Sequence, residues 1–154
     1  SAASDVYKRQ VMTAGGTVSV PLARHPVHRI KRAVSANGQE AITHYRVVQR
    51  YAAHTHIRVN LETGRTHQIR VHMSSLGHPL VGDMKYGAKR LLPKGIGEEK
   101  MRVVRQIDRH ALHSARLCFH HPRTGETCRL SAQWPKDFVK LVEALGGIVE
   151  IWDW

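Results

Sequence analysis

The chain has 154 residues and carries 24 Lys and Arg against 12 Asp and Glu, which gives a formal net charge of +12. This length is enough for one domain or a piece of one, and the positive charge predicts a polyanionic partner. Aromatic residues make up only 6% of the chain, which argues against an array of stacking platforms for single-stranded nucleic acid. The sequence shows no apolar run of the about 18 residues that a membrane span needs and no signal peptide, so we expect a cytoplasmic protein with no membrane partner.

The first residues differ from the rest of the chain. Residues 1–10 fit no helix or strand pattern, and we expect them to be a non-native leader, with authentic sequence starting near Val11. Gly15-Gly16 then predicts a turn, and Thr17–Val20 a short strand that is closed by Pro21.

A basic segment without helical or strand periodicity follows this strand. In one interpretation it is a solvated loop, as most charge runs are; in the other it contacts the phosphates of a nucleic acid, and the net charge of the chain favours the second. The candidate phosphate-binding cations of this segment are Arg24, Arg29, Lys31 and Arg32.

The next segment predicts a pair of antiparallel strands. Asn37-Gly38 is a strong turn signal, and residues 41–48 read as a strand. A second strand over 55–62 alternates apolar Ile57, Val59 and Leu61 with polar residues. The turn near Ala52-Ala53 would allow the two strands to pair.

A short helix is predicted after Gly64, with Ile69, Met73 and Leu76 as its apolar stripe, Thr66 as its N-cap and Gly77 at its end. Arg70 falls off this stripe and one turn from His67, so a guanidinium and an imidazole share the other face. An arginine there can bind a carboxylate or a phosphate. From spacing alone, a structural ion pair or a solvated face is the favoured alternative.

The C-terminal half predicts a loop, a hairpin and two helices. Asp83 is expected to hold its turn, through turn hydrogen bonds or a pair with a nearby arginine. The basic stretch 89–105 contains a loop at Pro93 and a short helix near 98–104, and reads as an RNA-facing insertion or a disordered connection. The remaining expectations are a strand with a possible bulge at 109–120, a turn at 122–125, a return strand at 126–132, a helix after Pro135 that ends at Gly146-Gly147, and a tail at 148–154.

These elements predict an α+β fold, with a mixed, mainly antiparallel sheet and a few packed helices. Cys118 and Cys128 fall on neighbouring strands, so a disulfide is conceivable, but reduced, buried thiols are the favoured expectation. Four histidines, His54, His56, His67 and His72, lack the acidic or cysteine partners of a metal site. We therefore expect no metal, and histidines that lie at the surface or face RNA.

One continuous string carries a family resemblance. Gly64-Arg65-Thr66-His67-Gln68-Ile69-Arg70-Val71-His72, followed by Gly77-His78-Pro79-Leu80, Gly82-Asp83 and Tyr86-Gly87, resembles the signature of pseudouridine synthases of the family that modifies ribosomal and transfer RNA. A second block, Leu112-His113-Ser114-Ala115 with Leu117, Phe119 and His121-Pro122, resembles the next segment of that family. The resemblance runs from Val11 to about Pro135, and it assigns 11–147 to the C-terminal portion of the catalytic domain.

The resemblance implies an enzyme that isomerises specific uridines, here in large-subunit ribosomal RNA, as a monomer and without cofactor or metal. In this family a catalytic Asp acts on a flipped-out base. Arg70 matches the basic residue that pairs with this carboxylate, and Leu112 matches the position that packs near the base. Arg65, His67 and Gln68 are candidates for supporting the site or contacting RNA.

The nucleophile itself is missing from the chain. The family's aspartate follows Arg-Leu, and none of Asp5, Asp83, Asp108, Asp137 and Asp153 does. We expect the motif upstream of Val11 and expect the chain alone to be inactive. The alternative is a basic RNA-binding module without catalysis; a metal-dependent nuclease is weaker, because clustered carboxylates are absent.

Overall fold

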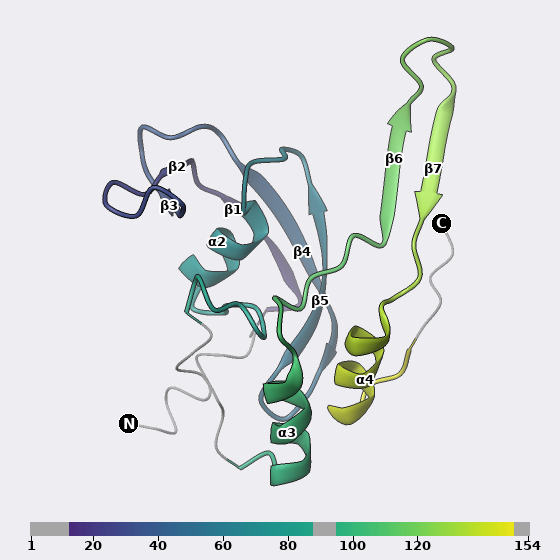
Figure 1. Cartoon of the computed structure of the whole chain (residues 1–154). Coiled ribbons are helices and arrows are strands. Elements are labelled where there is room, and N and C mark those ends of the chain that lie inside the picture. The colour runs from purple at the N-terminus through teal and green to yellow at the C-terminus, as the bar shows by residue number, and fades with distance from the viewer. Residues whose placement is uncertain (1–12, 88–94, 150–154) are drawn as a thin grey trace.

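The computed structural model describes residues 13–87 and 95–149. The expected leader 1–10, the loop at Pro93 and the last five residues of the tail therefore lie outside the described part of the chain. Figure 1 shows the elements in order: β1 (Gly15–Ser19), β2 (Leu22–Arg24), β3 (Arg32–Val34), β4 (Ile42–Arg50), β5 (Thr55–Leu61), α2 (Gln68–Ser75), α3 (Glu98–Gln106), β6 (Arg116–His120), β7 (Thr127–Ser131) and α4 (Lys136–Ala144). The α+β class is confirmed. All described strand pairs are antiparallel, and they form three separate sheets.

The largest sheet has the order β1-β4-β5. The predicted pairing of β4 with β5 is confirmed, with one register shift between Val47 and Gln49. The turn predicted at Gly15-Gly16 is wrong, because both glycines lie in β1 opposite Arg46 and Tyr45. A Cβ on Gly15 would lie 2.7 Å from the carbonyl oxygen of Tyr45, so glycine at this position permits close pairing of the strands rather than a turn.

The basic segment forms a small hairpin of its own. It is not a plain loop, because Arg24 in β2 pairs directly with Arg32 in β3. The chain between them, His25–Lys31, makes the connection, and a hydrogen bond from His25 N to the carbonyl oxygen of Lys31 closes it at 3.0 Å.

Helix α2 and the burial of Met73 are confirmed, but the predicted N-cap and the predicted burial of Leu76 are wrong. It starts at Gln68, and the residue before it, His67, has a left-handed backbone with φ of 57° and no capping side chain. The side chain of Gln68 folds back and accepts the N–H of Arg65, which lies before the helix, at 3.0 Å. The buried residues are Gln68, Val71, His72 and Met73, whereas Leu76 is exposed. A stripe drawn from apolar residues alone missed this face because two of its four members are polar and fully hydrogen-bonded.

The strand predicted at 109–120 is present only as β6, and its first half is wrong. Residues 109–115 run as an irregular segment because their hydrogen bonds go elsewhere: Ala111 N donates to the carbonyl oxygen of Val81 at 2.7 Å, and Arg109 donates to the carbonyls of His110 and Leu112. The hairpin turn, the return strand β7 and helix α4 are confirmed.

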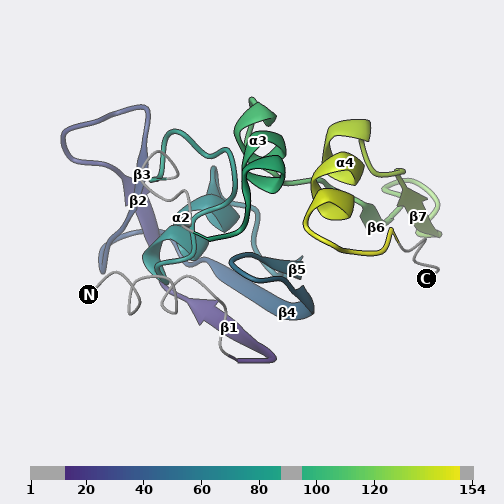
Figure 2. The ribbon, with the colours of Figure 1, turned by 90° about the horizontal axis from the view of Figure 1, so that it is seen from below.

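Two apolar clusters hold these elements together. One joins the end of β4 to α3 and α4 through Tyr51, Val104, Ile107, Leu141 and Leu145. The other packs α2 against β2 and the residue that precedes β4, through Leu22, Ala41 and Val71. Figure 2 shows α2 and α3 on the same face of the β1-β4-β5 sheet.

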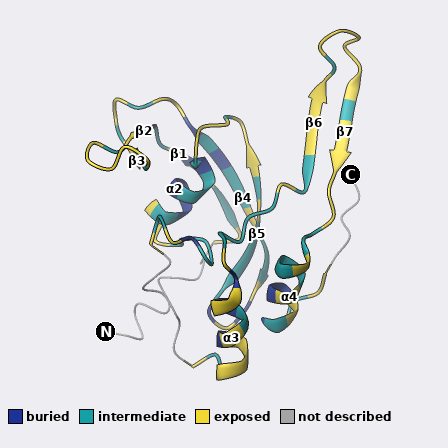
Figure 3. Ribbon diagram, in the orientation of Figure 1, coloured by how far each residue is buried: buried dark blue, intermediate teal, exposed yellow. Residues whose placement is uncertain are grey.

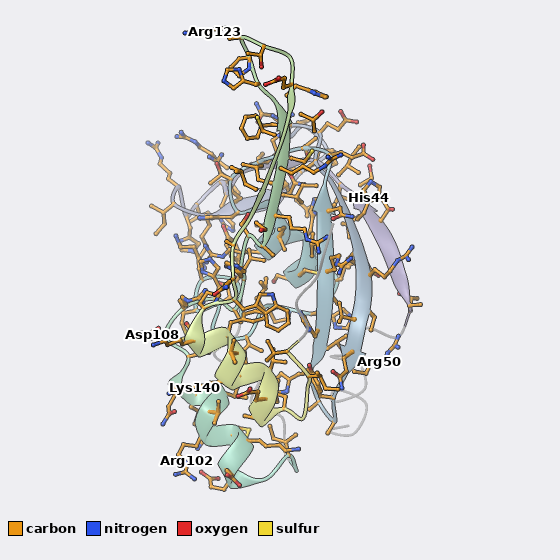
Figure 4. All side chains as sticks on the ribbon, turned by 90° about the vertical axis from the view of Figure 1, so that its right-hand side faces the viewer. His44, Arg50, Arg102, Asp108, Arg123 and Lys140 are labelled. Carbon is orange, nitrogen blue, oxygen red and sulfur yellow. The ribbon has the colours of Figure 1, made fainter. Side chains whose placement is uncertain are left out.

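The β6–β7 hairpin projects away from the rest of the molecule (Figures 1 and 3). Cys118 lies opposite Arg129, and Cys128 lies opposite Phe119, so successive positions place the two thiols on opposite faces. Both cysteines are free, and the expectation that they are buried is wrong because Cys118 is exposed. Figure 4 shows Arg123 at the tip of this hairpin and Arg102 and Lys140 on the outer sides of α3 and α4, so positive charge is spread over several elements.

Candidate functional site

A surface pocket of about 260 Å³ opens beside the N-terminus of α2. It is smaller than the roughly 300–1,000 Å³ typical of sites for drug-sized ligands. The structure brings to it all five residues that the sequence proposed for the substrate site, together with two aliphatic residues. The lining consists of Leu61, Arg65, His67, Gln68, Ile69, Arg70 and Leu112.

Arg70 is held by a bidentate ion pair with Asp83. Its Nε and Nη2 donate to the two carboxylate oxygens of Asp83, each at 2.8 Å. The side chains are 12% and 0% exposed, so the pair is largely shielded from water. The expected role of Asp83, holding its turn and pairing with a nearby arginine, is confirmed, since its Oδ1 also accepts the N–H of Lys85 at 3.1 Å. A guanidinium has five N–H donors, so Arg70 keeps donors beyond those that Asp83 uses.

The electrostatics of this pair favour both charges. Burial opposes ionisation of Asp83, but the hydrogen bonds and charge of Arg70, with two backbone N–H groups, outweigh it and lower the pKa of Asp83 below its ordinary value. The hydrogen bond to Asp83 raises the pKa of Arg70. Asp83 thus fixes a permanently charged guanidinium in the wall of the pocket.

Tyr86 connects Arg70 to His67. The Arg70 guanidinium lies over the Tyr86 ring, 5.0 Å from its centroid, in the position of a cation–π contact. The Tyr86 oxygen accepts the N–H of Arg32 at 2.9 Å and lies 2.7 Å from His67 Nδ1, where the tautomer of His67 decides which group donates. A neutral imidazole has one donor nitrogen and one acceptor nitrogen, so the role of His67 Nε2 is the opposite of that of Nδ1.

His67 is biased toward this neutral form. Burial, and after it the positive charges of Arg70 and Lys85, lower the pKa of His67, and Asp83 only partly opposes them. No functional role was predicted for Tyr86 from the sequence. The available signal was its place in the family-like string, three residues after Asp83.

Gln68 lines the pocket and connects the segments around it through hydrogen bonds. Its amide donates to the carbonyl of Ile42 and to Thr43 Oγ1, and its oxygen accepts from Thr63 Oγ1 and the N–H of Arg65. With donors and acceptor all engaged and a side chain that is buried, Gln68 fits a supporting role rather than contact with a substrate.

The same polar chain continues to His72. Thr43 Oγ1 lies 2.8 Å from His72 Nδ1, and His72 Nε2 donates to the carbonyl of Val20 at 2.9 Å. His72 is completely buried, so the expectation of a surface or RNA-facing histidine is wrong for it. Its polar atoms all have partners, which permits the burial.

Arg65 and Leu112 complete the pocket from two further segments. Arg65 is exposed, and its Nε donates to the carbonyl of Glu40 at 2.8 Å. Leu112 lies in the irregular segment and is held there by Arg109, whose guanidinium bonds the carbonyl of Leu112 and both carboxylate oxygens of Asp137.

The basic hairpin β2–β3 is tied to the same platform. Besides the bond from Arg32 N to Tyr86, Lys85 Nζ donates to the carbonyl of Ile30 at 3.4 Å. Of the proposed phosphate-binding cations, Arg32 therefore has its backbone tied to Tyr86, Arg24 lies opposite it in β2, and Arg29 and Lys31 belong to the connection between the two strands.

Residues 13–87 and 95–149 contain neither a cluster of metal-ligating side chains nor a helix that could span a membrane. Within those ranges no three His, Cys, Asp or Glu side chains are grouped so that they could hold a metal ion, and no helix is long and apolar enough for a bilayer.

Comparisons with known proteins agree on one family. A family model described as RNA pseudouridylate synthase matches residues 4–75. Ribosomal large subunit pseudouridine synthase D of Pasteurella multocida (strain Pm70) is 50% identical over 135 residues, which cover 88% of this chain and 42% of the relative. The protein of the same name from Vibrio vulnificus (strain CMCP6) is 51% identical over 134 residues, which cover 87% of this chain and 41% of the relative.

A solved structure has the same fold. The human protein RNA Pseudouridylate Synthase Domain Containing 4 superposes with a TM-score of 0.63 at 26% identity, covering 86% of this chain and 57% of that one. The chain spans about two fifths of the length of the curated relatives it matches.

Proposed function

We propose that the chain belongs to the RNA pseudouridylate synthase family, whose model matches residues 4–75, and that the intact gene product isomerises specific uridines of large-subunit ribosomal RNA to pseudouridine. The observation that carries this proposal is the pocket in which Arg70, fixed by Asp83, faces the same space as Leu112. The name of the relatives supports the choice of ribosomal RNA. The cytoplasmic location, the monomeric state and the absence of a cofactor remain predictions.

The pocket divides into an apolar and a polar part, and the two parts have different tasks. Leu61, Ile69 and Leu112 offer apolar contact to the face of one flipped-out base. The donors of Arg70 that Asp83 does not use would hold the nucleophilic carboxylate ionised and oriented. His67, which also lines the pocket, would form a hydrogen bond with the substrate through Nε2.

Asp83 contributes indirectly to this chemistry. A guanidinium without a partner at this depth would carry a large desolvation cost, and its long side chain would sample several rotamers. The bidentate pair removes both problems before substrate arrives, so that Arg70 presents its remaining donors in one geometry.

Variants of the intact gene product test the proposal. Arg70→Gln should lower pseudouridine formation in a large-subunit ribosomal RNA transcript by about a hundredfold or more, with RNA binding little changed. The exposed Leu130 of β7 supplies the control, since Leu130→Ser should leave the rate unchanged. Normal pseudouridine formation by Arg70→Gln would refute the role of Arg70.

The alternative is a basic RNA-binding module without catalysis. The observation that favours it is that none of the described aspartates, Asp83, Asp108 and Asp137, lines the pocket. RNA binding by the intact gene product without any pseudouridine would establish the module. The chain by itself is expected to form no pseudouridine, and formation by it would contradict that expectation.

A further inference from the structure

The tip of the basic hairpin carries two exposed aliphatic side chains that belong to neither of the two apolar clusters described above. Val27 and Ile30 are each 75% exposed, the highest values among the exposed large apolar residues of the described chain. Both belong to the connection His25–Lys31 between β2 and β3. Figure 3 shows this tip as an exposed projection beside α2.

Cations surround the two aliphatic residues. Arg29 separates Ile30 from His28, Lys31 follows it, and the paired Arg24 and Arg32 form the base of the hairpin. No acidic residue occurs between Pro21 and Gln39. An apolar tip on a cationic stem is the arrangement with which proteins insert a side chain between stacked bases while their cations hold the phosphates.

The tip is held in one conformation from within. His25 Nδ1 accepts the backbone N–H groups of Val27 and His28, at 3.2 and 3.0 Å. Lys31 N donates to the carbonyl of His28 at 2.8 Å. A connection with this many internal bonds loses little conformational entropy when it binds, so the aliphatic side chains are presented before a partner arrives.

The hairpin is also positioned relative to the pocket. Arg32 N donates to the Tyr86 oxygen, which in turn bonds His67 in the pocket wall, and Lys85 reaches the carbonyl of Ile30 itself. The tip and the pocket thus belong to one hydrogen-bonded platform. A nucleic acid that occupies the pocket with one nucleotide would pass this tip with a neighbouring part of the same strand.

We propose that Val27 and Ile30 form a wedge that enters the base stack of an RNA stem-loop beside the uridine that occupies the pocket. The wedge rests on the proposed function, because RNA is taken as the partner. Its physical task is to replace stacking contacts that the flipped-out nucleotide gives up, since each unstacked step costs free energy. The cations of the hairpin supply affinity, and the two aliphatic residues supply local unstacking.

Base unstacking and RNA affinity are measured separately, and a different variant tests each of them. The probe is a synthetic RNA stem-loop with 2-aminopurine next to a loop uridine, whose fluorescence rises when the base unstacks. Val27→Ser/Ile30→Ser should reduce the rise at saturation by about threefold or more while the Kd changes by less than about threefold. Arg29→Gln/Lys31→Gln should weaken binding and lower the salt slope by about two, with the rise at saturation retained.

A matched control removes two exposed aliphatic side chains elsewhere. Leu117 and Leu130 face each other across β6 and β7 and are 55% and 54% exposed. Leu117→Ser/Leu130→Ser should leave both the Kd and the fluorescence rise unchanged. Circular dichroism of each variant verifies that it is folded, and replacement at such exposed positions should not disturb the core.

The outcomes distinguish the wedge from the proposed function. An unchanged fluorescence rise in Val27→Ser/Ile30→Ser, with RNA still bound, overturns the wedge and leaves the proposed function standing. A complete lack of salt-dependent RNA binding by the wild-type chain overturns the RNA partner and the wedge together. Binding to anionic phospholipid vesicles that needs Val27 and Ile30, with the RNA readouts unaffected by their replacement, would assign the tip to a membrane surface and also overturn the wedge.

Discussion

The replacement Asp83→Asn tests the ion pair on which the site depends. The change keeps the shape of the side chain and the oxygen that accepts the N–H of Lys85. It removes the negative charge and turns one of the two acceptors of Arg70 into a donor. Removal of one partner from a buried pair costs about 3–5 kcal/mol, because the other charge stays buried without compensation.

The structure places the expected loss near the lower end of that range. Arg70 is 12% exposed, so water can reach part of its guanidinium after the change. We therefore expect the free energy of unfolding to fall by about 3 kcal/mol at pH 7, a large share of the about 5–15 kcal/mol that holds most domains together. Urea unfolding followed by circular dichroism measures this loss as a lower midpoint with an unchanged slope.

A second ion pair provides the control. Arg109 and Asp137 pair through the same atoms at the same distance of 2.8 Å, but their side chains are 35% and 40% exposed. Exposed pairs contribute little because water already solvates both charges. The shift of the urea midpoint in Asp137→Asn should therefore be only a small fraction of that in Asp83→Asn.

The dependence on pH identifies the charge as the cause. The pKa of Asp83 is lowered in the folded state, so its ionisation stabilises the fold above the unfolded pKa of about 3.9. This stabilisation is lost as the pH falls through the lower, folded pKa. The gap between wild type and Asp83→Asn should stay constant from pH 7 to about pH 5 and shrink below about pH 4. Equal midpoints at pH 7, or a gap that does not shrink in acid, would refute the reasoning.

Two further predictions concern the backbone at the site and the charge of His67. Gly82→Ala should lower the free energy of unfolding by about 3 kcal/mol, because Gly82 has φ of 75° and a Cβ there would collide with a carbonyl oxygen of the irregular segment. The control is Gly77→Ala, at φ of 82° in open space, which should lower it by only about 1 kcal/mol. Equal losses in the two variants would argue against the collision. Lys85→Gln should raise the pKa of His67 in a histidine NMR titration, because it removes one of the positive charges that disfavour the imidazolium. The pKa of His67 should still remain below its ordinary value, since burial is the larger cause. An unchanged pKa would show that Lys85 does not act on the ring.

Local patterns in the sequence determined most of the secondary structure. The strand patterns at 41–48 and 55–62, with the turn near Ala52-Ala53, predicted the β4–β5 pair. The helix expected after Pro135 is α4, which buries Leu141 and Val142. Such patterns are local consequences of which side of an element meets the core, so they can be read without knowing the fold. The family resemblance likewise named the five residues that meet in the pocket, four from the string at 64–87 and Leu112 from the second block.

Only the tertiary structure decided which partners these residues have. Gln68 and His72 are buried because Thr43, 25 and 29 positions away, satisfies their polar groups, and no local pattern distinguishes such residues from exposed ones. The sequence predicted a turn at Gly15 and Gly16, whereas the structure shows that they allow the close approach of β1 to β4.

The site shows the same division between sequence and structure. The sequence supplied Arg70 and two alternative roles for Asp83, and the structure shows that Asp83 has both, because it pairs with Arg70 and accepts the N–H of Lys85. The link from Arg32 through Tyr86 to His67 spans 54 positions of the chain at its first step. Contacts of this kind depend on how separate elements pack against one another. Residue type and spacing along one segment therefore determine the elements and the candidate residues, and packing determines the hydrogen bonds, the charges and the pocket that they form.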